Sequence, residues 1–432
     1  MEPQADNASL NSAVAKATRR LLPVLGFGYL FNYIDRTNVG FAALQMNDAL
    51  GLTATQFGLA AGLFYVGYCL VEVPSNIGLH RFGARLWLAR IMISWGVLSA
   101  ATAAVVGPKS FYAARILCGV AEAGFFPGVI YFLATWFPVA VRARILAWFM
   151  LAIPVSSVIS GPLSTALLGL DGRAGLAGWQ WLFLVEGVPA CVLGFVTLRA
   201  LPNSPREAPW LNSDEKAALE AALGQDRSSN QHKNLMAALL DPRVLILSLA
   251  YFCFIVGVLG IGIWLPQMLK GFGLGTQEIG VVSALPYLFA AVAMVTWARF
   301  VDRSRRYLKH YVLGCLVASA GFALSMTSLG LGIAMLGITI AVLGLNAARA
   351  PFFSIPPRFL AGAAAAGGIA LINSFGNLGG FLGPYMMGWL KDSTGSFSAG
   401  LALLSAFLAL SALLSLLLVV IDRPTAHHTG LA

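Results

Sequence analysis

Charged residues are scarce in this sequence, and their scarcity excludes most soluble folds. Of its 432 residues only 11% are Asp, Glu, Lys or Arg, whereas 58% are hydrophobic and the mean hydropathy is +0.78. Soluble domains carry about 25% charged residues. Apolar runs of about 20 residues, which is enough to cross about 30 Å of hydrocarbon, recur along the chain. The composition predicts a polytopic, all-α membrane protein.

Residues that carry enzyme chemistry are also few. The five cysteines have no metal-ligand spacing and all fall in apolar runs, which favours core positions, and the five histidines form no cluster with them. We therefore expect no enzyme, no metal and no cofactor. Residues 1–20 contain no apolar core of a signal peptide, so we expect no cleavable signal.

Twelve apolar runs predict twelve transmembrane helices. They start near residues 20, 55, 86, 110, 144, 180, 243, 279, 308, 331, 362 and 397. Most of the 28 Lys and Arg residues fall in the N-terminal arm, alternate connections and the tail. Because basic loops stay in the cytoplasm, both termini are expected there. The net charge of +10 is thus a topology signal, and no nucleic acid is implied.

An offset of 222 residues aligns the two halves of the chain, which indicates an internal parallel repeat of six helices. The matched positions are Gly58 with Gly280, Tyr65 with Tyr287, Arg81 with Arg303, and Gly161-Pro162 with Gly383-Pro384. The expected domains are an N-terminal arm (1–19), a six-helix bundle (20–201), a cytoplasmic linker (202–242), a second six-helix bundle (243–421) and a tail (422–432).

The linker contains Pro202, Pro205 and Pro209, followed by a charged amphipathic stretch from Asp214 to Leu223. A polar helix of this kind usually rests on the membrane surface. We expect it to tether the two halves and rank a regulatory role below that.

Four charged residues lie inside predicted spans: Asp35 and Arg36 in one, Arg115 and Glu122 in another. A charge at bilayer depth costs at least about 2.5 kcal/mol, so these residues imply an internal cavity. Arg115 and Glu122 are seven residues apart, which places them on one face of a helix. The offset of 222 brings no ionisable residue to the corresponding positions, so charge handling is assigned to the N-terminal half.

These four residues suggest a proton-dependent anion site. Arginine stays charged and offers a planar fork that matches a carboxylate. A buried carboxyl group can take up a proton or pair with a neighbouring arginine. Our hypothesis is that Asp35 and Glu122 alternate between pairing with Arg36 and Arg115 and being protonated, so that an organic anion takes the arginines. The alternative is a set of structural ion pairs.

For the other polar residues in the predicted spans, the sequence leaves two roles open. Asn373 and Asn377 are one turn apart and would bond a substrate or a neighbouring helix. Tyr33 and Tyr68 would line the cavity or pack, and Arg349 would be a third cavity cation or lie at the interface. Glu72 and Glu186 are expected near helix ends, where they would anchor loops. Basic clusters that include Arg81 and Arg85, with Asp302 and Arg303 in the repeat, are expected to act as latches between the halves.

Several longer stretches carry a resemblance to a known family. They are NYIDR (32–36), VPSN (73–76), GAR (83–85), RILCGVAEAGFFP (115–127), GWQWLFLVEGVPA (178–190), WLP (264–266) and ALINSFGNLGGFLGP (370–384). Through them the chain resembles the major facilitator superfamily and, within it, the anion:cation symporter family of tartrate, phthalate, galactonate and hexuronate transporters. One departure is His80, at a position where that superfamily usually has Asp.

The resemblance implies that Arg36 and Arg115 bind the carboxylate of the anion, that Asp35 and Glu122 carry the coupling protons, and that Tyr33, Tyr68, Asn373 and Asn377 touch the substrate. The expected function is proton-coupled import of a small organic anion, such as a dicarboxylate, an aromatic carboxylate or a sugar acid. The expected setting is a bacterial cytoplasmic (inner) membrane, as a monomer in the lipid bilayer. An anion exchanger, a sodium-coupled or efflux transporter and a non-transporting sensor are the alternatives.

Overall fold

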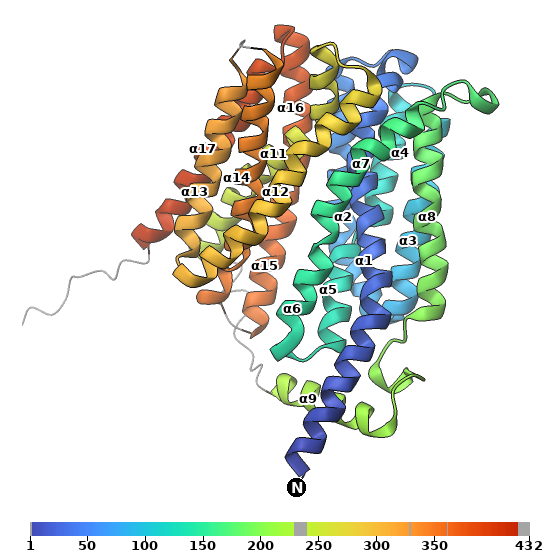
Figure 1. Cartoon of the computed structure of the whole chain (residues 1–432), viewed down its shortest axis with the longest axis vertical. Helices are drawn as coiled ribbons and strands as arrows, with labels where there is room; N and C mark the ends of the chain where they lie inside the picture. The colour runs from blue at the N-terminus through green and yellow to red at the C-terminus, as the bar shows by residue number, and fades with distance from the viewer. Residues whose placement is uncertain (1, 229–239, 328–329, 361, 422–432) are drawn as a thin grey trace, which may run out of the picture. The chain divides into compact units, whose positions relative to one another are not determined.

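A computed structural model describes residues 2–228, 240–327, 330–360 and 362–421, and this part of the chain is helical with no strand (Figure 1). The longer helices are α1 (Glu2–Leu50), α2 (Ala54–Phe82), α3 (Ala84–Ala101), α4 (Pro108–Glu122), α5 (Phe125–Trp136), α6 (Val139–Met150), α7 (Ala152–Leu168), α8 (Gly178–Ala200), α9 (Ser213–Ser228), α11 (Pro242–Gly271), α12 (Thr276–Ser304), α13 (Tyr307–Ser325), α14 (Leu331–Phe353), α15 (Gly362–Asn377), α16 (Gly379–Thr394) and α17 (Ser398–Ile421).

The predicted all-α membrane architecture is confirmed. Within the described residues, 10 helical segments are long and apolar enough to cross a membrane, and they correspond to ten of the twelve predicted spans. The two other predicted spans depart from a simple apolar helix. One is in α1, which carries Asp35 and Arg36, and the other is divided at Leu378 into α15 and α16.

The chain packs as two compact units. Unit 1 comprises Met1–Gln231, Ile261–Leu288 and Pro384–Ser396, and unit 2 comprises His232–Gly260, Phe289–Gly383 and Phe397–Ala432. The ends of α11, α12 and α16 therefore pack with the N-terminal helices. The expected boundaries between the two six-helix halves remain a prediction.

The core of unit 1 is rich in large aromatic side chains. Trp95, Trp136, Phe125 and Phe132 are each 1% exposed or less. In this unit α2 packs along α4, α3 packs along α8, and α1 contacts both α7 and α8. The charged segment of α1 also contacts Ser99 of α3 and Glu122 of α4 through side chains.

Two contacts within unit 1 are related by the sequence repeat. A Cβ atom at Gly58 would collide with the carbonyl oxygen of Pro384, and one at Gly161 would collide with the carbonyl oxygen of Gly280. The offset of 222 residues converts Gly58 into Gly280 and Gly161-Pro162 into Gly383-Pro384. The α2–α16 contact and the α12–α7 contact therefore join segments that the sequence repeat relates. Glycine at 58 and 161 permits this backbone approach.

Polar contacts close the end of unit 1 at which α1 ends and α2 begins. Asn47 donates to Gln267 at 3.2 Å, and the Lys270 ammonium lies 3.2 Å from the Asp48 carboxylate. The Asp392 carboxylate of α16 accepts from the backbone N–H groups of Ala54 (3.1 Å) and Thr55 (2.7 Å). These N–H groups have no partner inside α2, so Asp392 caps the helix from another segment.

Unit 2 is held together by a buried hydroxyl network and by aromatic stacking. Tyr311 of α13 lies 2.7 Å from the Ser411 hydroxyl of α17, which in turn donates to the Ala250 carbonyl oxygen of α11 at 2.8 Å. Tyr251 stacks on Phe352 of α14 with ring centroids 4.8 Å apart. The Tyr311 and Ser411 hydroxyls thus both have partners, as burial requires.

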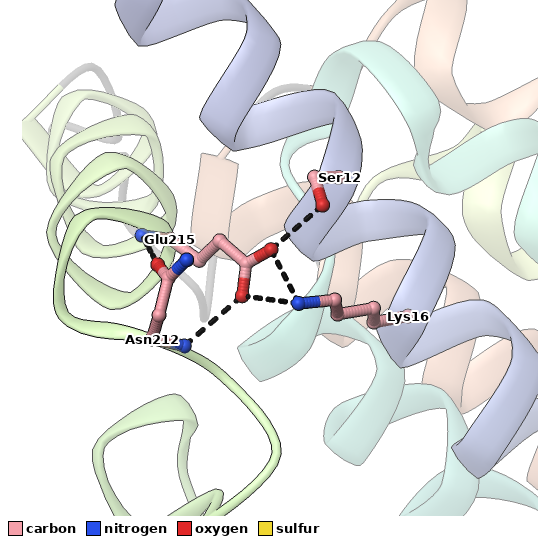
Figure 2. A network of polar contacts seen from close by, with 4 residues as sticks. All are labelled: Ser12, Lys16, Asn212 and Glu215. Atoms are coloured by element: carbon pink, nitrogen blue, oxygen red, sulfur yellow. Dashed lines mark hydrogen bonds and ion pairs between the residues drawn. The ribbon is translucent and has the colours of Figure 1, made fainter.

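Helix α9 of the linker packs against the N-terminal part of α1, before the predicted first span. Apolar residues from both sides share one cluster, including Ala13, Ala17, Leu211, Leu219 and Leu223. Figure 2 shows the polar part of this contact, in which Ser12 donates to Glu215 at 2.6 Å and Lys16 lies 2.7 Å from the same carboxylate. The apolar face of α9 therefore packs against α1, and its expected position at the membrane surface remains a prediction.

Glu215 makes this docking dependent on pH. Hydrogen bonds from Lys16 and Ser12 lower the pKa of the Glu215 carboxyl from 4.5 to about 2. A lowered pKa means that the contribution of Glu215 to stability is complete above pH 4.5 and is lost as the pH falls toward about 2. We expect Glu215→Gln to lower the melting temperature at pH 7 and to increase hydrogen exchange in residues 213–224.

This difference from the parent protein should shrink as the pH falls below 4.5. The control is Glu220→Gln, because Glu220 pairs with an Arg206 side chain that is 80% exposed, and exposed pairs contribute little. Equal exchange rates in the parent and Glu215→Gln would show that the carboxylate does not hold the linker.

Candidate functional site: a buried charge cluster

Helix α1 places Asp35 in the interior of unit 1. The residue is 2% exposed. Ser99 of α3 donates to the Asp35 Oδ1 atom, and Asn38, one turn along α1, donates to the same oxygen at 3.4 Å. The Oδ2 atom is buried and has no hydrogen-bond partner among the described residues. Among the described residues, one oxygen of this carboxyl thus accepts hydrogen bonds and the other does not.

Glu122 lies at the C-terminal end of α4, where the predicted span breaks. Gly124 adopts a positive φ of 89°, and α5 begins at Phe125. The Ser75 hydroxyl of α2 donates to the Ala123 carbonyl oxygen at 2.6 Å, which satisfies one backbone group at the break. The break leaves Glu122 fully buried at the end of a helix.

Arg36 and Glu122 form a buried ion pair. The Arg36 Nε and Nη2 atoms each lie 2.5 Å from Glu122 Oε1. The Glu122 side chain is 0% exposed, whereas that of Arg36 is 16% exposed. The arginine of this pair is thus partly exposed, whereas the carboxylate is enclosed.

Arg115 differs from Arg36 because no acid within ion-pairing distance compensates it among the described residues. It is 2% exposed, and its Cζ atom lies 4.8 Å from the centroid of the Phe64 ring. Arg36 faces the same ring at 5.7 Å and the Tyr68 ring at 5.1 Å. A cation over an aromatic face gains about 2 kcal/mol when desolvated, which offsets only part of the cost of burying a guanidinium.

The two guanidinium groups face the same ring and therefore form one site, but their charges are compensated to different extents. Arg36 is neutralised by Glu122, whereas Arg115 lies over the Phe64 ring and in the field of Asp35. An anionic group placed between them would gain from both arginines. The arrangement is therefore a candidate binding site for an anion.

The structure brings together five of the predicted site residues in unit 1. Asp35, Arg36, Arg115 and Glu122 form the cluster, and Tyr68 covers Arg36. Tyr33 is half-buried on α1, with its ring edge-on to Tyr29. Asn373, Asn377 and Arg349 are half-buried residues of unit 2, and their roles remain predictions.

The predicted latch residues lie at turns between helices. Arg81 is exposed, with its guanidinium 5.5 Å from the Phe82 ring. The Arg85 backbone N–H donates to Asn203 of the linker at 3.1 Å. Arg303 is exposed in unit 2, and the side chain of Asp302 lies outside those that the structure describes. The latch function remains a prediction.

Two sequence interpretations need correction. Glu72 and Glu186 do not lie near helix ends to anchor loops. Glu72 is inside α2 and 4% exposed, and Glu186 is inside α8 and 3% exposed. An apolar run gives no internal marker of where its helix begins, so the depth of these acids was misjudged.

Phe64, Asn38 and Ser99 also belong to the site and were missed. The signal for Phe64 was its spacing of four from Tyr68, which stacks both rings on one helix face. Asn38 follows Asp35 by one turn, so the same reasoning applied to α1 would have found it. Nothing in the sequence points to Ser99 in α3.

The fold has many membrane-spanning helices and encloses a buried charge cluster, which is typical of membrane transport proteins. The model of the Major Facilitator Superfamily matches residues 25–384, and the chain belongs to this family of transporters, which are not enzymes. The expected superfamily is confirmed.

Similar proteins whose names denote transporters agree with this class. An Agrobacterium vitis protein named "Putative tartrate transporter" is 47% identical over 96% of this chain and 93% of its own length. A "Quinolone resistance transporter" of Acinetobacter baumannii is 42% identical over 91% of each chain, and the inner membrane transport protein RhmT of Escherichia coli is 33% identical over 98% of this chain and 99% of its own.

Solved structures support the fold. A bacterial homologue of the human lysosomal transporter Spinster superimposes with a TM-score of 0.76 at 16% identity, over 94% of this chain and 98% of that one. A D-xylose-proton symporter gives a TM-score of 0.71 at 18% identity, over 92% and 96%. At such identities the comparison shows the fold alone.

Proposed function

We propose that the protein is a proton-coupled symporter that imports a small organic anion, with a tartrate-like dicarboxylate as the first candidate, across a bacterial cytoplasmic membrane with both termini inside. The observation that carries this proposal is the buried Arg36–Glu122 pair beside Arg115, an arginine without an acid partner among the described residues. The names of the tartrate-type relatives and of the inner membrane protein RhmT support the substrate class and the location.

The cluster couples the anion to protons by competition for arginine. Glu122 occupies Arg36 while it is ionised, and a carboxylate of the substrate competes for the same guanidinium fork. Protonation of Glu122 releases Arg36, and protonation of Asp35 removes the anionic field near Arg115. With both acids neutral the site presents two positive charges, which matches a dianion.

The contacts at the α1–α2 end of unit 1 fit transport by alternating access. Under the predicted topology this end faces the outside, and it is closed by Asp392 on the α2 N-terminus and by Lys270 on Asp48. Each contact is polar and local, so separating the segments exchanges these hydrogen bonds for bonds with water at small net cost. The two repeat-related glycine contacts would open together.

Efflux is a second candidate function. It is favoured by the 42% identity with the quinolone resistance transporter, since its name denotes resistance. The same charge cluster would serve in either direction, because a coupled carrier runs down whichever gradient is larger. A measurement of direction under imposed gradients separates import from efflux.

Reconstituted full-length protein provides the test. We expect an inward proton gradient to raise tartrate uptake into proteoliposomes at least about tenfold over no gradient, and an inward sodium gradient to have no effect. Phthalate and galactonate serve as competitors that report the substrate class. Tartrate uptake that ignores the pH gradient would rule out proton coupling, and the absence of binding to any of these carboxylates would rule out the substrate class.

A further inference from the structure

A surface depression on helix α8 of unit 1 combines apolar side chains with a cation. Its lining residues are Val192, Phe195, Val196, Arg199 and Ala200. Val192, Phe195 and Val196 are exposed, although α8 is long and apolar enough to span a membrane. Exposed apolar side chains on such a helix face lipid chains, so the depression lies at the surface between protein and lipid.

Helix α3 packs beside α8 in the antiparallel direction (Figure 1). A Cβ atom at Gly96 would lie 2.7 Å from the Gly187 carbonyl oxygen, and one at Gly194 would lie 3.1 Å from the Ala89 carbonyl oxygen. Residue numbers thus rise along one helix while those of the contacting residues fall along the other. The start of α3 is therefore next to the end of α8.

Arg90 of α3 and Phe195 of α8 lie on the same side of this contact. At about 100° per residue, each of them is about a quarter turn beyond a contact residue, Ala89 or Gly194. Between antiparallel helices, equal turns in the same sense lead to the same side. Arg199 follows Phe195 by four residues and shares its face of α8. Arg90, Phe195 and Arg199 therefore border one groove, which we call the α3–α8 groove.

Both arginines of the α3–α8 groove serve the end at which α3 begins. The Arg90 Cζ atom lies 4.3 Å from the centroid of the Trp87 ring, which is three residues nearer the start of α3. Trp87 is held in place because its Nε1 atom donates to the Ser75 hydroxyl at 3.1 Å. Arg199 lies in the last turn of α8, beside the same end of α3.

The charges of these two arginines are not compensated within the described part of the chain. Neither forms an ion pair with an acid there. Of the linker acids, Glu207 accepts a backbone N–H and Glu215 pairs with Lys16. The Arg90 Nε atom is buried and has no hydrogen-bond partner among the described residues. An aromatic ring offsets only part of the cost of burying a guanidinium, so an external anion would stabilise this site.

We propose that the α3–α8 groove binds an anionic phospholipid, whose phosphate contacts Arg90 and Arg199 and whose acyl chain covers Val192 and Phe195. A guanidinium fork matches the geometry of a phosphate. The apolar wall favours a lipid over free phosphate, and two uncompensated cations disfavour the positive headgroup of a zwitterionic lipid. Under the predicted topology the groove opens to the cytoplasmic leaflet, where basic pockets between helices bind anionic headgroups. The proposal goes beyond the proposed function and does not depend on it.

Melting curves of the purified full-length protein in a neutral detergent test this proposal. The probes are phosphatidylglycerol and phosphatidylcholine with the same acyl chains. Both lipids raise the melting temperature if they bind the folded state, and phosphatidylglycerol should half-saturate at a concentration at least about tenfold lower. Arg90→Gln and Arg199→Gln should each raise the half-saturating phosphatidylglycerol concentration about tenfold or more, because each removes one charge-assisted contact. The double variant should not distinguish the two lipids.

Two variants and one further probe separate the groove from general surface charge. Arg144→Gln removes an exposed arginine from α6 and should leave the preference for phosphatidylglycerol unchanged. Val192→Trp places a large ring in the groove without a change of charge and should weaken phosphatidylglycerol binding. Inorganic phosphate alone should not change the melting temperature.

Equal half-saturation by the two lipids in the parent protein would overturn the proposal, as would a preference that survives in the double variant. A preference that Arg144→Gln lowers as far as Arg90→Gln would reduce the effect to net charge and remove the site. Unchanged phosphatidylglycerol binding in Val192→Trp, or an equal shift with inorganic phosphate, would exclude a lipid in this groove. If Arg90→Gln does not fold, Arg199→Gln and Val192→Trp provide the same test.

Discussion

Replacing Arg115 by Ala is expected to weaken tartrate binding by a factor of about 30 to several thousand. Removing one partner of a buried charge pair costs about 2–5 kcal/mol, and each 1.4 kcal/mol is tenfold in affinity. Arg115 is the candidate for the strongest substrate contact, because no acid within ion-pairing distance occupies it among the described residues. Arg115→Lys should recover only part of the affinity, since an ammonium lacks the planar fork.

The measurement is the shift in melting temperature of purified protein with tartrate. Without ligand, Arg115→Ala should melt close to the parent protein, because the variant also loses a desolvated charge. The control is Arg90→Ala, which removes another arginine stacked on an aromatic ring, at 4.3 Å from Trp87. A full tartrate shift in Arg115→Ala would show that this arginine does not bind the anion.

Glu122→Gln is expected to separate substrate exchange from proton coupling. The amide resembles the protonated acid, so Arg36 remains available to the anion, but no proton is bound or released at this position. Uptake driven by a pH gradient should fall at least about tenfold, whereas exchange of internal for external tartrate should continue. Both rates are measured in the same proteoliposomes.

Two comparisons make this result specific. Glu207→Gln, an exposed acid of the linker that accepts the Asn203 N–H, should leave both rates unchanged. Asp35→Asn should also lose the pH-driven component if both acids carry coupling protons. Gradient-driven uptake that persists in Glu122→Gln would remove Glu122 from the coupling mechanism.

The class of this protein followed from physical constraints that act on local sequence. A chain with few charges and twelve apolar runs must satisfy its backbone polar groups internally, and in a membrane helices do so within each span. The four charges in two spans were recognisable for the same reason, since a charge at that depth is costly wherever the helix lies. Asp35, Arg36, Arg115 and Glu122 did not require a structure to be found.

The sequence did not show which arginine pairs with which acid. The spacing of seven residues suggested that Arg115 and Glu122 share a face, but Glu122 pairs with Arg36 of another helix, and Arg115 lies over Phe64. The break after Glu122 and the packing of α2 along α4 decide this. Both depend on contacts between helices that lie far apart in the chain.

The sequence alone determined that this is a helical membrane protein with a repeat and a buried set of charges, because periodicity, hydropathy and the cost of burying charge are local properties. Tertiary structure decided which arginine is neutralised, that Glu186 lies in the interior, and that α9 packs on α1. Those outcomes depend on which helices become neighbours. Neighbours are selected by the packing of whole surfaces, which no single segment encodes.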